Sequence, residues 1–340
     1  MFTGKTRNML DHSRRVFIQG LIAAAATGTG MSLVSRAAAQ AQSSLPPLPA
    51  VDPIVESLQV ISTGHEWSEG PVWVGGENGY LLFTDVPGNT IHRWDGRSTT
   101  VFLRPSGYAG TPVPSTIREG GANGLALGRG GLVIADSGNR CISVIDLATR
   151  RRTVIVDRYQ GKRFNSPNDV VVASNGDIYF TDPPYGLAGI ADSALRELPF
   201  TGVFRITPDN QLHLITDALF PNGIALSPDQ HTLYSTDREG WIAIDLDAQW
   251  RPAGQRVLVA SSSIGGGGDG MKTDASGNLW CSGPGGVHVF SRAGQRIGQV
   301  RVEGRTSNCA FGPGGYIYIT NAQRVVRGKI SERFARTAGA

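Results

Sequence analysis

The sequence predicts an all-β protein, a six-bladed β-propeller whose four-stranded blades surround a central channel. Three observations favour this fold class. The 340 residues include 45 Gly and 19 Pro, and only 18% are charged, which is typical of many short strands joined by tight turns. A segment made of a polar residue, a strand, a Gly-containing turn and a second strand recurs six times. The copies repeat at the length of propeller blades, not at the shorter periods of superhelical repeats or β-solenoids.

The first 39 residues have the pattern of a twin-arginine (Tat) signal peptide. They contain the pair Arg14 and Arg15, the mildly apolar stretch "LIAAAATGTGMSLVS" and then small residues, with cleavage expected near Ala39 or Ala41. A membrane anchor is the alternative, but about 15 apolar residues diluted with Gly and Thr are fewer than the roughly 20 that span a bilayer. We therefore expect the Tat export machinery as a partner, a periplasmic or secreted protein, and no membrane anchoring after cleavage.

Charge and cysteine content bear on the binding partners of the protein and on the state of its thiols. Residues 1–39 hold five basic residues and one acidic residue, so the formal charge of +4 falls to zero without them. A neutral chain has no electrostatic reason to bind nucleic acid or an anionic membrane. The three cysteines, Cys141, Cys281 and Cys309, lie in apolar strand-like segments without CxxC spacing. We expect buried thiols, with one disulfide as the alternative.

Each copy of the repeat supplies the first two strands of a blade. The copies begin, in order, at Glu69, Asn123, Asn168, Asn222, Asp269 and Asn308, the six leading residues, which are 39 to 54 residues apart. Third and fourth strand candidates follow, for example "TIHRWD" and "TTVFL" after the first copy. The last copy lacks a fourth strand, so residues 56–62, "ESLQVIS", are predicted to close the ring. The propeller then spans residues 55–330, between a linker at 40–54 and a loose C-terminal tail at 331–340.

The first strand of each propeller blade lines the central channel, so the six leading residues are expected to meet at one mouth of that channel. They are two carboxylates and four carboxamides, without cysteine or histidine. Such hard oxygen ligands suit Ca²⁺, or Mg²⁺ or Mn²⁺. A single Asn-Gly or Asp-Gly pair could equally be a turn. Recurrence in every blade favours a site, because buried carboxylates that face one another need a cation or a proton between them.

Four motifs carry a resemblance to a known family. They are "SEGPVW", "SPNDV", "PNGIA" and "GDGM", in this order and at these blade positions. Together they resemble the SMP-30/gluconolactonase/luciferin-regenerating-enzyme family, over about residues 55–330, and the sequence "GANGLAL" around Asn123 resembles its bacterial gluconolactonase branch. Animal members carry an arginine where this chain has Ser166, so their substrate preference does not carry over.

The resemblance implies a divalent metal, usually Ca²⁺, with Zn²⁺, Mn²⁺ or Mg²⁺ as alternatives. The metal ligands that it implies are Glu69, Asn222 and Asp269, while Asn168 contributes to the metal or to the substrate. Asn123 is expected near the substrate.

A cation held by three or four side-chain oxygens keeps positions open for water and a lactone carbonyl, and stabilises the charge formed on attack. Asp269 is the expected catalytic residue, which orients or deprotonates a water near the metal. Direct attack by its carboxylate is the alternative. Two long segments, residues 104–121 and 183–202, are expected to overhang the same face. They offer Arg118, Tyr108 and Tyr185 as substrate contacts.

Three functions fit these features. The favoured one is a secreted Ca²⁺-dependent lactonase that opens an aldonolactone such as glucono-1,5-lactone. The alternatives are a related metal-dependent hydrolase of another lactone or a phosphoester, and a non-catalytic binding propeller in which the metal only stabilises a channel filled by side chains.

His65, on the loop before the first leading residue, and His92, in a third strand, are expected to be structural. Trp73, Trp94 and Trp280 are expected to pack between blades.

Overall fold

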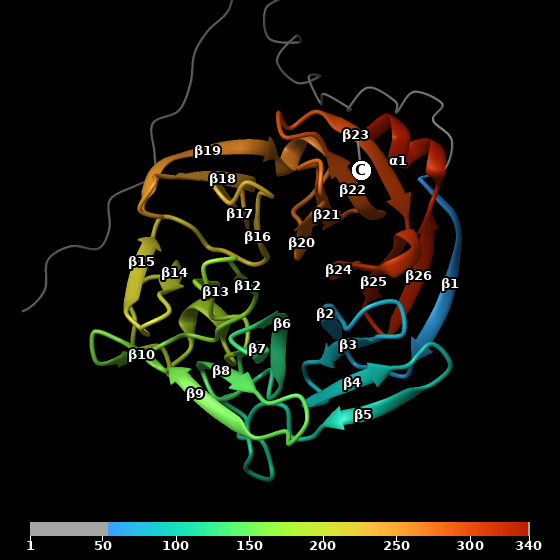
Figure 1. Cartoon of the computed structure of the whole chain (residues 1–340). Helices are drawn as coiled ribbons and strands as arrows, with labels where there is room; N and C mark the ends of the chain where they lie inside the picture. Colours follow the sequence, from blue (N-terminus) through green and yellow to red (C-terminus); the bar gives the residue numbers. More distant parts are fainter. Residues whose placement is uncertain (1–53, 339–340) are drawn as a thin grey trace, which may run out of the picture. The chain divides into compact units, whose positions relative to one another are not determined.

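The computed structural model describes residues 54–338, so the expected Tat signal and most of the linker, residues 1–53, lie outside the described range. Six four-stranded antiparallel sheets surround a central axis as the blades of a propeller, and the predicted fold class is confirmed (Figure 1). In residues 54–338, no helix is long and apolar enough to cross a membrane.

The first three blades follow one another along the chain. Blade 1 holds β2 (Ser68–Val74), β3 (Tyr80–Asp85), β4 (Thr90–Trp94) and β5 (Thr99–Leu103). Blade 2 holds β6 (Ala122–Gly128), β7 (Gly131–Asp136), β8 (Cys141–Ile145) and β9 (Arg152–Val156). A small hairpin of β10 (Arg158–Tyr159) and β11 (Lys162–Arg163) follows. Blade 3 holds β12 (Val170–Val172), β13 (Ile178–Asp182), β14 (Gly202–Ile206) and β15 (Leu212–Thr216).

The other three blades complete the ring. Blade 4 holds β16 (Ile224–Leu226), β17 (Thr232–Asp237), β18 (Gly240–Leu246) and β19 (Pro252–Ala260). Blade 5 holds β20 (Met271–Thr273), β21 (Leu279–Gly283), β22 (Gly286–Phe290) and β23 (Arg296–Arg301). Blade 6 holds β24 (Asn308–Gly312), β25 (Tyr316–Asn321), β26 (Arg324–Ile330) and β1 (Val55–Thr63). The first strands β2, β6, β12, β16, β20 and β24 lie nearest the axis (Figure 1).

The ring is closed by the strand that the sequence predicts. β1 pairs antiparallel with β26, for example Val60 with Val326, although one belongs to the start and the other to the end of the described chain. The predicted loose tail is wrong. Residues Glu332–Ala338 form a helix, α1, and Phe334 is 5% exposed. Its ring packs edge-on against Trp280, at 5.7 Å between centroids, so burial of one aromatic side chain fixes the helix to blade 5.

Neighbouring blades pack through apolar and aromatic side chains. Trp73 of blade 1 stacks on Tyr318 of blade 6 at 5.3 Å, and Trp94 approaches the same tyrosine at 5.8 Å. Trp280 of blade 5 lies edge-on to Phe311 of blade 6 at 5.4 Å. The expected inter-blade role of these tryptophans is confirmed. The three cysteines are buried free thiols, as expected.

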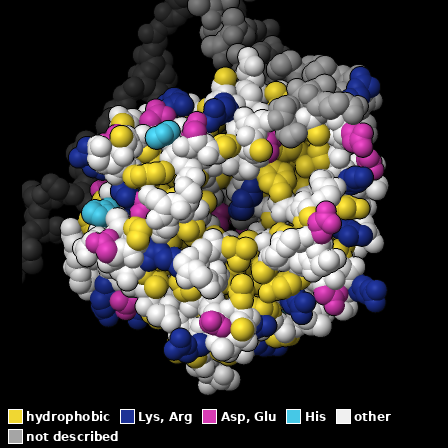
Figure 2. All heavy atoms as spheres, in the orientation of Figure 1, with side chains coloured by type: hydrophobic (Ala, Val, Ile, Leu, Met, Phe, Trp, Pro, Cys, Tyr) yellow, Lys and Arg dark blue, Asp and Glu magenta, His cyan; other side chains and the backbone are white. Residues whose placement is uncertain are grey.

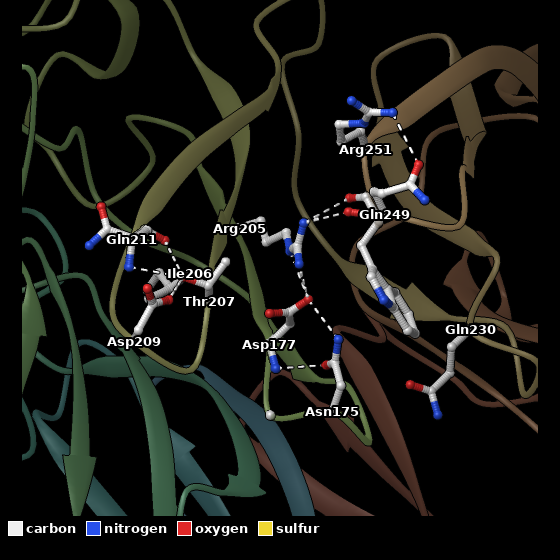
Figure 3. A network of polar contacts seen from close by, with 12 residues as sticks. Asn175, Asp177, Arg205, Ile206, Thr207, Asp209, Gln211, Gln230, Gln249 and Arg251 are labelled. Carbon is white, nitrogen blue, oxygen red and sulfur yellow. Dashed lines mark hydrogen bonds and ion pairs between the residues drawn. The ribbon is translucent and has the colours of Figure 1, made fainter.

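Polar contacts join blades 3 and 4 at the turns opposite the leading residues (Figure 3). Arg205 of β14 donates from Nε to Oδ2 of Asp177, at 2.7 Å, and from Nη1 to the carbonyl oxygen of Gln249, at 3.1 Å. Asn175 donates to the same Asp177 oxygen at 2.9 Å. Asp177 is fully buried, so this arginine supplies the charge that its carboxylate needs.

In three blades a carboxylate at the end of the second strand holds the loop before the leading residue. The backbone N–H donors, at 2.6–3.2 Å, are Glu66 and Trp67 to Asp85, Asn165 to Asp182, and Phe220 to Asp237. The aspartate that ends the repeated pattern is therefore a structural residue, which fixes the approach of the chain to the axis.

Candidate functional site

Five of the six leading residues line one cavity of about 800 Å³. They are Glu69, Asn123, Asn168, Asn222 and Asp269. The sixth, Asn308, does not line the cavity. It is 1% exposed, and its amide donates to Oδ2 of Asp169 at 3.4 Å. A hollow at the centre of the ring, with basic and acidic side chains inside it, is visible in Figure 2. The expected meeting of the leading residues at the channel is therefore observed for five of them.

A glycine follows four of the six leading residues and allows adjacent first strands to approach closely. The N–H of Gly223 donates to the carbonyl oxygen of Asp269 at 3.2 Å, and a Cβ at Gly223 would lie 2.3 Å from that oxygen. In the same way, a Cβ at Gly270 would lie 2.1 Å from the Asn308 side chain. The Asn-Gly and Asp-Gly pairs are thus contacts between blades rather than hairpin turns.

Carboxylates crowd the axis. Glu69 and Asp269 line the cavity, and Asp169, 2% exposed, lies beside them. Burial raises the pKa of Glu69 well above its usual range, and the charges of Asp269 and Asp169 raise it further. Burial also raises the pKa of Asp269 to about 8, with contributions from Asp169 and Glu119. Three carboxylates in such proximity cannot all be ionised unless a cation lies among them.

The amide groups at this point also fit a cation. Oδ1 of Asn222 is buried and has no hydrogen-bond partner among the described residues. Glu69 accepts a hydrogen bond from the Gly70 N–H at Oε2, at 2.9 Å, which orients its carboxylate. Buried, unsatisfied oxygen atoms beside mutually repelling carboxylates are the donors that a hard divalent ion such as Ca²⁺ prefers.

Sequence reasoning missed Asp169. It follows Asn168 directly, and its carboxylate accepts hydrogen bonds from the N–H groups of Val170 and Ile224, at 2.9 and 3.2 Å. The signal was available, because an aspartate just before the "VVV" strand nearest the axis places a charge where apolar residues are expected.

Two long loops form one wall of the cavity, as expected. Residues Ile117 and Leu187 form an isolated antiparallel bridge, and the N–H of Arg118 donates to the Gly186 carbonyl oxygen at 2.8 Å. This pairing places Arg118, Glu119 and Tyr185 among the lining residues.

Residues in and beside these two loops differ in whether they line the cavity. Glu119 forms an ion pair with Arg118, but its buried Oε2 has no partner among the described residues, and burial raises its pKa. Sequence reasoning did not single out Glu119, since nothing local marks it. Tyr108, expected as a substrate contact, is not among the lining residues. The fully buried Ser166 hydroxyl donates to the Pro183 carbonyl oxygen at 2.6 Å, so Ser166 anchors a loop instead of facing the cavity.

The opposite wall contains two further residues that the sequence did not reveal. Trp67 and Arg305 line the cavity, and the guanidinium of the exposed Arg305 lies 4.8 Å from the centroid of the Trp67 ring. The charge of Arg305 opposes the rise in the pKa of Asp269. Arg305 therefore gives the cavity a cationic group close to its carboxylates.

Known proteins resemble this chain along most of its length. A model of the SMP-30/gluconolactonase/LRE-like region matches residues 67–323. A gluconolactonase of Zymomonas mobilis subsp. mobilis is 41% identical over 300 residues, which are 83% of this chain and 83% of that protein. Regucalcin of Xenopus laevis is 27% identical over 278 residues, which are 77% of this chain and 85% of that protein.

Solved structures agree with this result. A gluconolactonase from Xanthomonas campestris is 30% identical and has a TM-score of 0.71, over 84% of this chain and 93% of the other. A calcium-binding regucalcin from Agrobacterium tumefaciens has a TM-score of 0.65, over 81% of this chain and 94% of the other, and its 21% identity shows a common fold alone. The four motifs, the propeller and these matches agree, and the chain belongs to the SMP-30/gluconolactonase/LRE-like family.

Proposed function

We propose that this protein hydrolyses an aldonolactone such as glucono-1,5-lactone, with Ca²⁺ held by Glu69, Asn168, Asn222 and Asp269. Lactone hydrolysis is supported by family membership and by the 41% identity to the Zymomonas gluconolactonase. The cation is supported by one observation above all: burial and the charge of Asp169 raise the pKa values of Glu69 and Asp269 beside an amide oxygen that has no partner among the described residues.

The cavity residues divide into metal ligands and substrate contacts. A bound cation would polarise the lactone carbonyl and stabilise the negative charge that develops on its oxygen. Asp269 would accept a proton from the water that attacks this carbonyl and return it to the ring oxygen when the C–O bond breaks. Glu69 would act as a ligand only, because its carboxylate is 3% exposed and oriented by the Gly70 N–H.

The walls of the cavity suit a polyhydroxylated ring. The amides of Asn123 and Asn168 can donate to ring hydroxyls, and the free Oε2 of Glu119 can accept a hydrogen bond from one. Trp67 offers an apolar surface, while Arg118 and Tyr185 add polar groups at the opposite wall. The open volume of about 800 Å³ argues against the non-catalytic alternative, which requires a plugged channel.

A substrate panel tests the activity and the metal together. We expect acid release, followed with a pH indicator, from glucono-1,5-lactone in the presence of Ca²⁺, and loss of this activity after chelation and dialysis that is reversed by added Ca²⁺. A γ-lactone and a phosphotriester separate the related hydrolases. Absence of turnover on every member of the panel would contradict the proposed enzyme, and full turnover without metal would contradict the proposed cofactor.

We also propose that the Tat machinery exports the chain to the periplasm or the medium, on the basis of Arg14 and Arg15 and the apolar stretch after them. Replacement of both arginines by lysine should leave the protein inside the cell with its first 39 residues attached. The natural chain should yield a mature N-terminus near residue 40 or 42. The measurement is cell fractionation followed by N-terminal sequencing, and unchanged export of the double variant would contradict the proposal.

A further inference from the structure

A second group of potential metal ligands lies outside the cavity, in blade 1. It consists of His65, on the loop before β2, Asp85, at the end of β3, and His92, on β4. One ligand atom from each lies within 4.8 Å of the others. His65 and Asp85 are buried and His92 is partly exposed. The three residues are far apart in the sequence, and the fold brings them together.

Each side chain is oriented as a metal ligand would be. Nε2 of His65 lies 2.8 Å from the Ser62 hydroxyl, so Nδ1 is the ring nitrogen left to bind a metal ion. The Asp85 carboxylate is fixed by the backbone N–H groups of Glu66 and Trp67. Neither ring nitrogen of His92 has a hydrogen-bond partner among residues 54–338. Burial lowers the pKa of His65, and that of His92 to about 4, so both rings are neutral at pH 7, the form that binds metals.

Blade 3 shows what the same positions do when only packing is required. There Phe164, Phe180 and Phe204 occupy the places of His65, Phe83 and His92. The edge-on pair has centroid distances of 5.2 Å in blade 3 and 5.0 Å in blade 1, and the stacked pair has 5.3 Å in both. The fold therefore needs aromatic rings at these positions but not ring nitrogens, and the two histidines of blade 1 require another explanation.

We propose that His65, Asp85 and His92 form a second metal site, for a divalent transition metal such as Zn²⁺. Two imidazoles and one carboxylate suit such an ion, whereas the all-oxygen set of the cavity suits Ca²⁺. Binding would draw the ligand atoms about 1 Å closer than they now lie, a shift within reach of side-chain motion. The partial exposure of His92 leaves one side open for water as a fourth ligand.

The site would act on the wall of the cavity. The loop that carries His65 continues through Trp67, whose N–H donates to Asp85 at 3.1 Å and whose ring lines the cavity. An ion at the site would tie this loop to β3 and β4, and so hold the Trp67 ring in place. The resulting stabilisation should appear as a metal-dependent rise in the melting temperature.

Zinc titration of the full chain, freed of metal with a chelator, tests the proposal. Calorimetry should show a Zn²⁺ site whose affinity falls at least about 100-fold in His65→Phe and in His92→Phe, variants that reproduce the rings of blade 3. The Zn²⁺-dependent rise in melting temperature should disappear in both. His231→Phe is the matched control, because His231 is an exposed histidine stacked on Trp250, and it should bind Zn²⁺ as the natural chain does.

Two further measurements keep this test independent of the proposed lactonase. Glu69→Gln should retain the Zn²⁺ site, since Glu69 belongs to the cavity. Co²⁺ added to the natural chain should give the strong visible absorption of nitrogen ligation at low coordination number, whether or not the variants fold. Equal Zn²⁺ binding by the double His→Phe variant and the natural chain, or no Co²⁺ spectrum, would overturn the proposal and leave the histidines as packing residues.

Discussion

Asp269 combines the features that a proton acceptor in the cavity needs. It lines the cavity and is only half-buried. Its backbone N–H donates a hydrogen bond to the Ser282 hydroxyl at 2.9 Å, which fixes the backbone at this residue. The backbone that carries the Asp269 side chain is thus fixed, while the residue remains partly exposed to water. Glu69, by contrast, is only 3% exposed.

Asp269→Asn should lower kcat/KM for glucono-1,5-lactone by about 100- to 10,000-fold, because the amide cannot take a proton from water. Initial rates give kcat/KM, and calorimetry gives the Ca²⁺ affinity, which should weaken with the loss of one charge. Asp245→Asn is the control, since Asp245 lies on β18 with a side chain 47% exposed. If the Asp269→Asn variant binds Ca²⁺ and keeps its full rate, the assignment of Asp269 as the base is contradicted.

The raised pKa of Asp182 should make the free energy of unfolding depend on pH. Burial raises its pKa in the folded protein to about 7, above the roughly 3.9 of an unfolded chain. Between these values the folded state holds a proton that the unfolded state has released, so stability falls as pH rises from about 4 to about 7.

Asp182→Asn removes this titration and can still accept the hydrogen bond from the Asn165 N–H. Urea unfolding of the chelated protein should therefore show that the natural chain loses stability relative to the variant across that interval. A difference in unfolding free energy that stays constant from pH 4 to pH 7 would contradict the assignment.

The first strands depend on the glycines that follow the leading residues. In blade 4, β16 approaches blade 5 so closely that a side chain at Gly223 would meet the Asp269 carbonyl oxygen. The two segments share a hydrogen bond at this point, and each presents a proposed metal ligand, Asn222 or Asp269, to the cavity. The spacing of the ligands is therefore a property of two elements and not of either residue alone.

Gly223→Ala should destabilise the protein by about 1–3 kcal/mol, because the added methyl group forces β16 and β20 apart. It should also weaken Ca²⁺ binding, since Asn222 moves with the strand. Gly254→Ala is the control, because its Cβ would meet nothing closer than Asp245 Oδ2 at 3.7 Å. Chemical denaturation and Ca²⁺ titration check both effects, and equal stability of the two variants would contradict the close approach.

Closure of the ring is a property of the whole molecule. β1 covers the outer edge of β26, whose Val325 and Val326 are fully or almost fully buried. A chain that begins at residue 64 lacks β1 and exposes this edge, so it should lose cooperative thermal unfolding and aggregate. A chain that begins at residue 40 keeps β1 and should unfold in one cooperative transition. Calorimetry and light scattering distinguish the two, and a cooperative transition in the shorter chain would contradict the role of β1.

The fold and much of the site could be predicted from the sequence because the chain repeats itself. Equivalent positions of a repeat converge on the axis, which is how Glu69, Asn222 and Asp269 could be grouped without a structure. Glu119 and Arg305 reach the cavity from loops that follow no repeat, so only the folded chain reveals them. The helix α1 escaped prediction for a related reason, since Phe334 is buried by Trp280, a residue more than fifty positions away.

The pairing of β1 with β26 also has a consequence for biosynthesis. Among the described strands, the ribosome makes β1 first and β26 last. The backbone of Val60 therefore has no pairing partner in the sheet until Val326 has been made. The sixth blade can be completed only after β26 has been made, so closure of the ring follows the folding of the other five blades. A message truncated before residue 324 yields a product with an unsatisfied β1, which is a template for association with other unfinished chains.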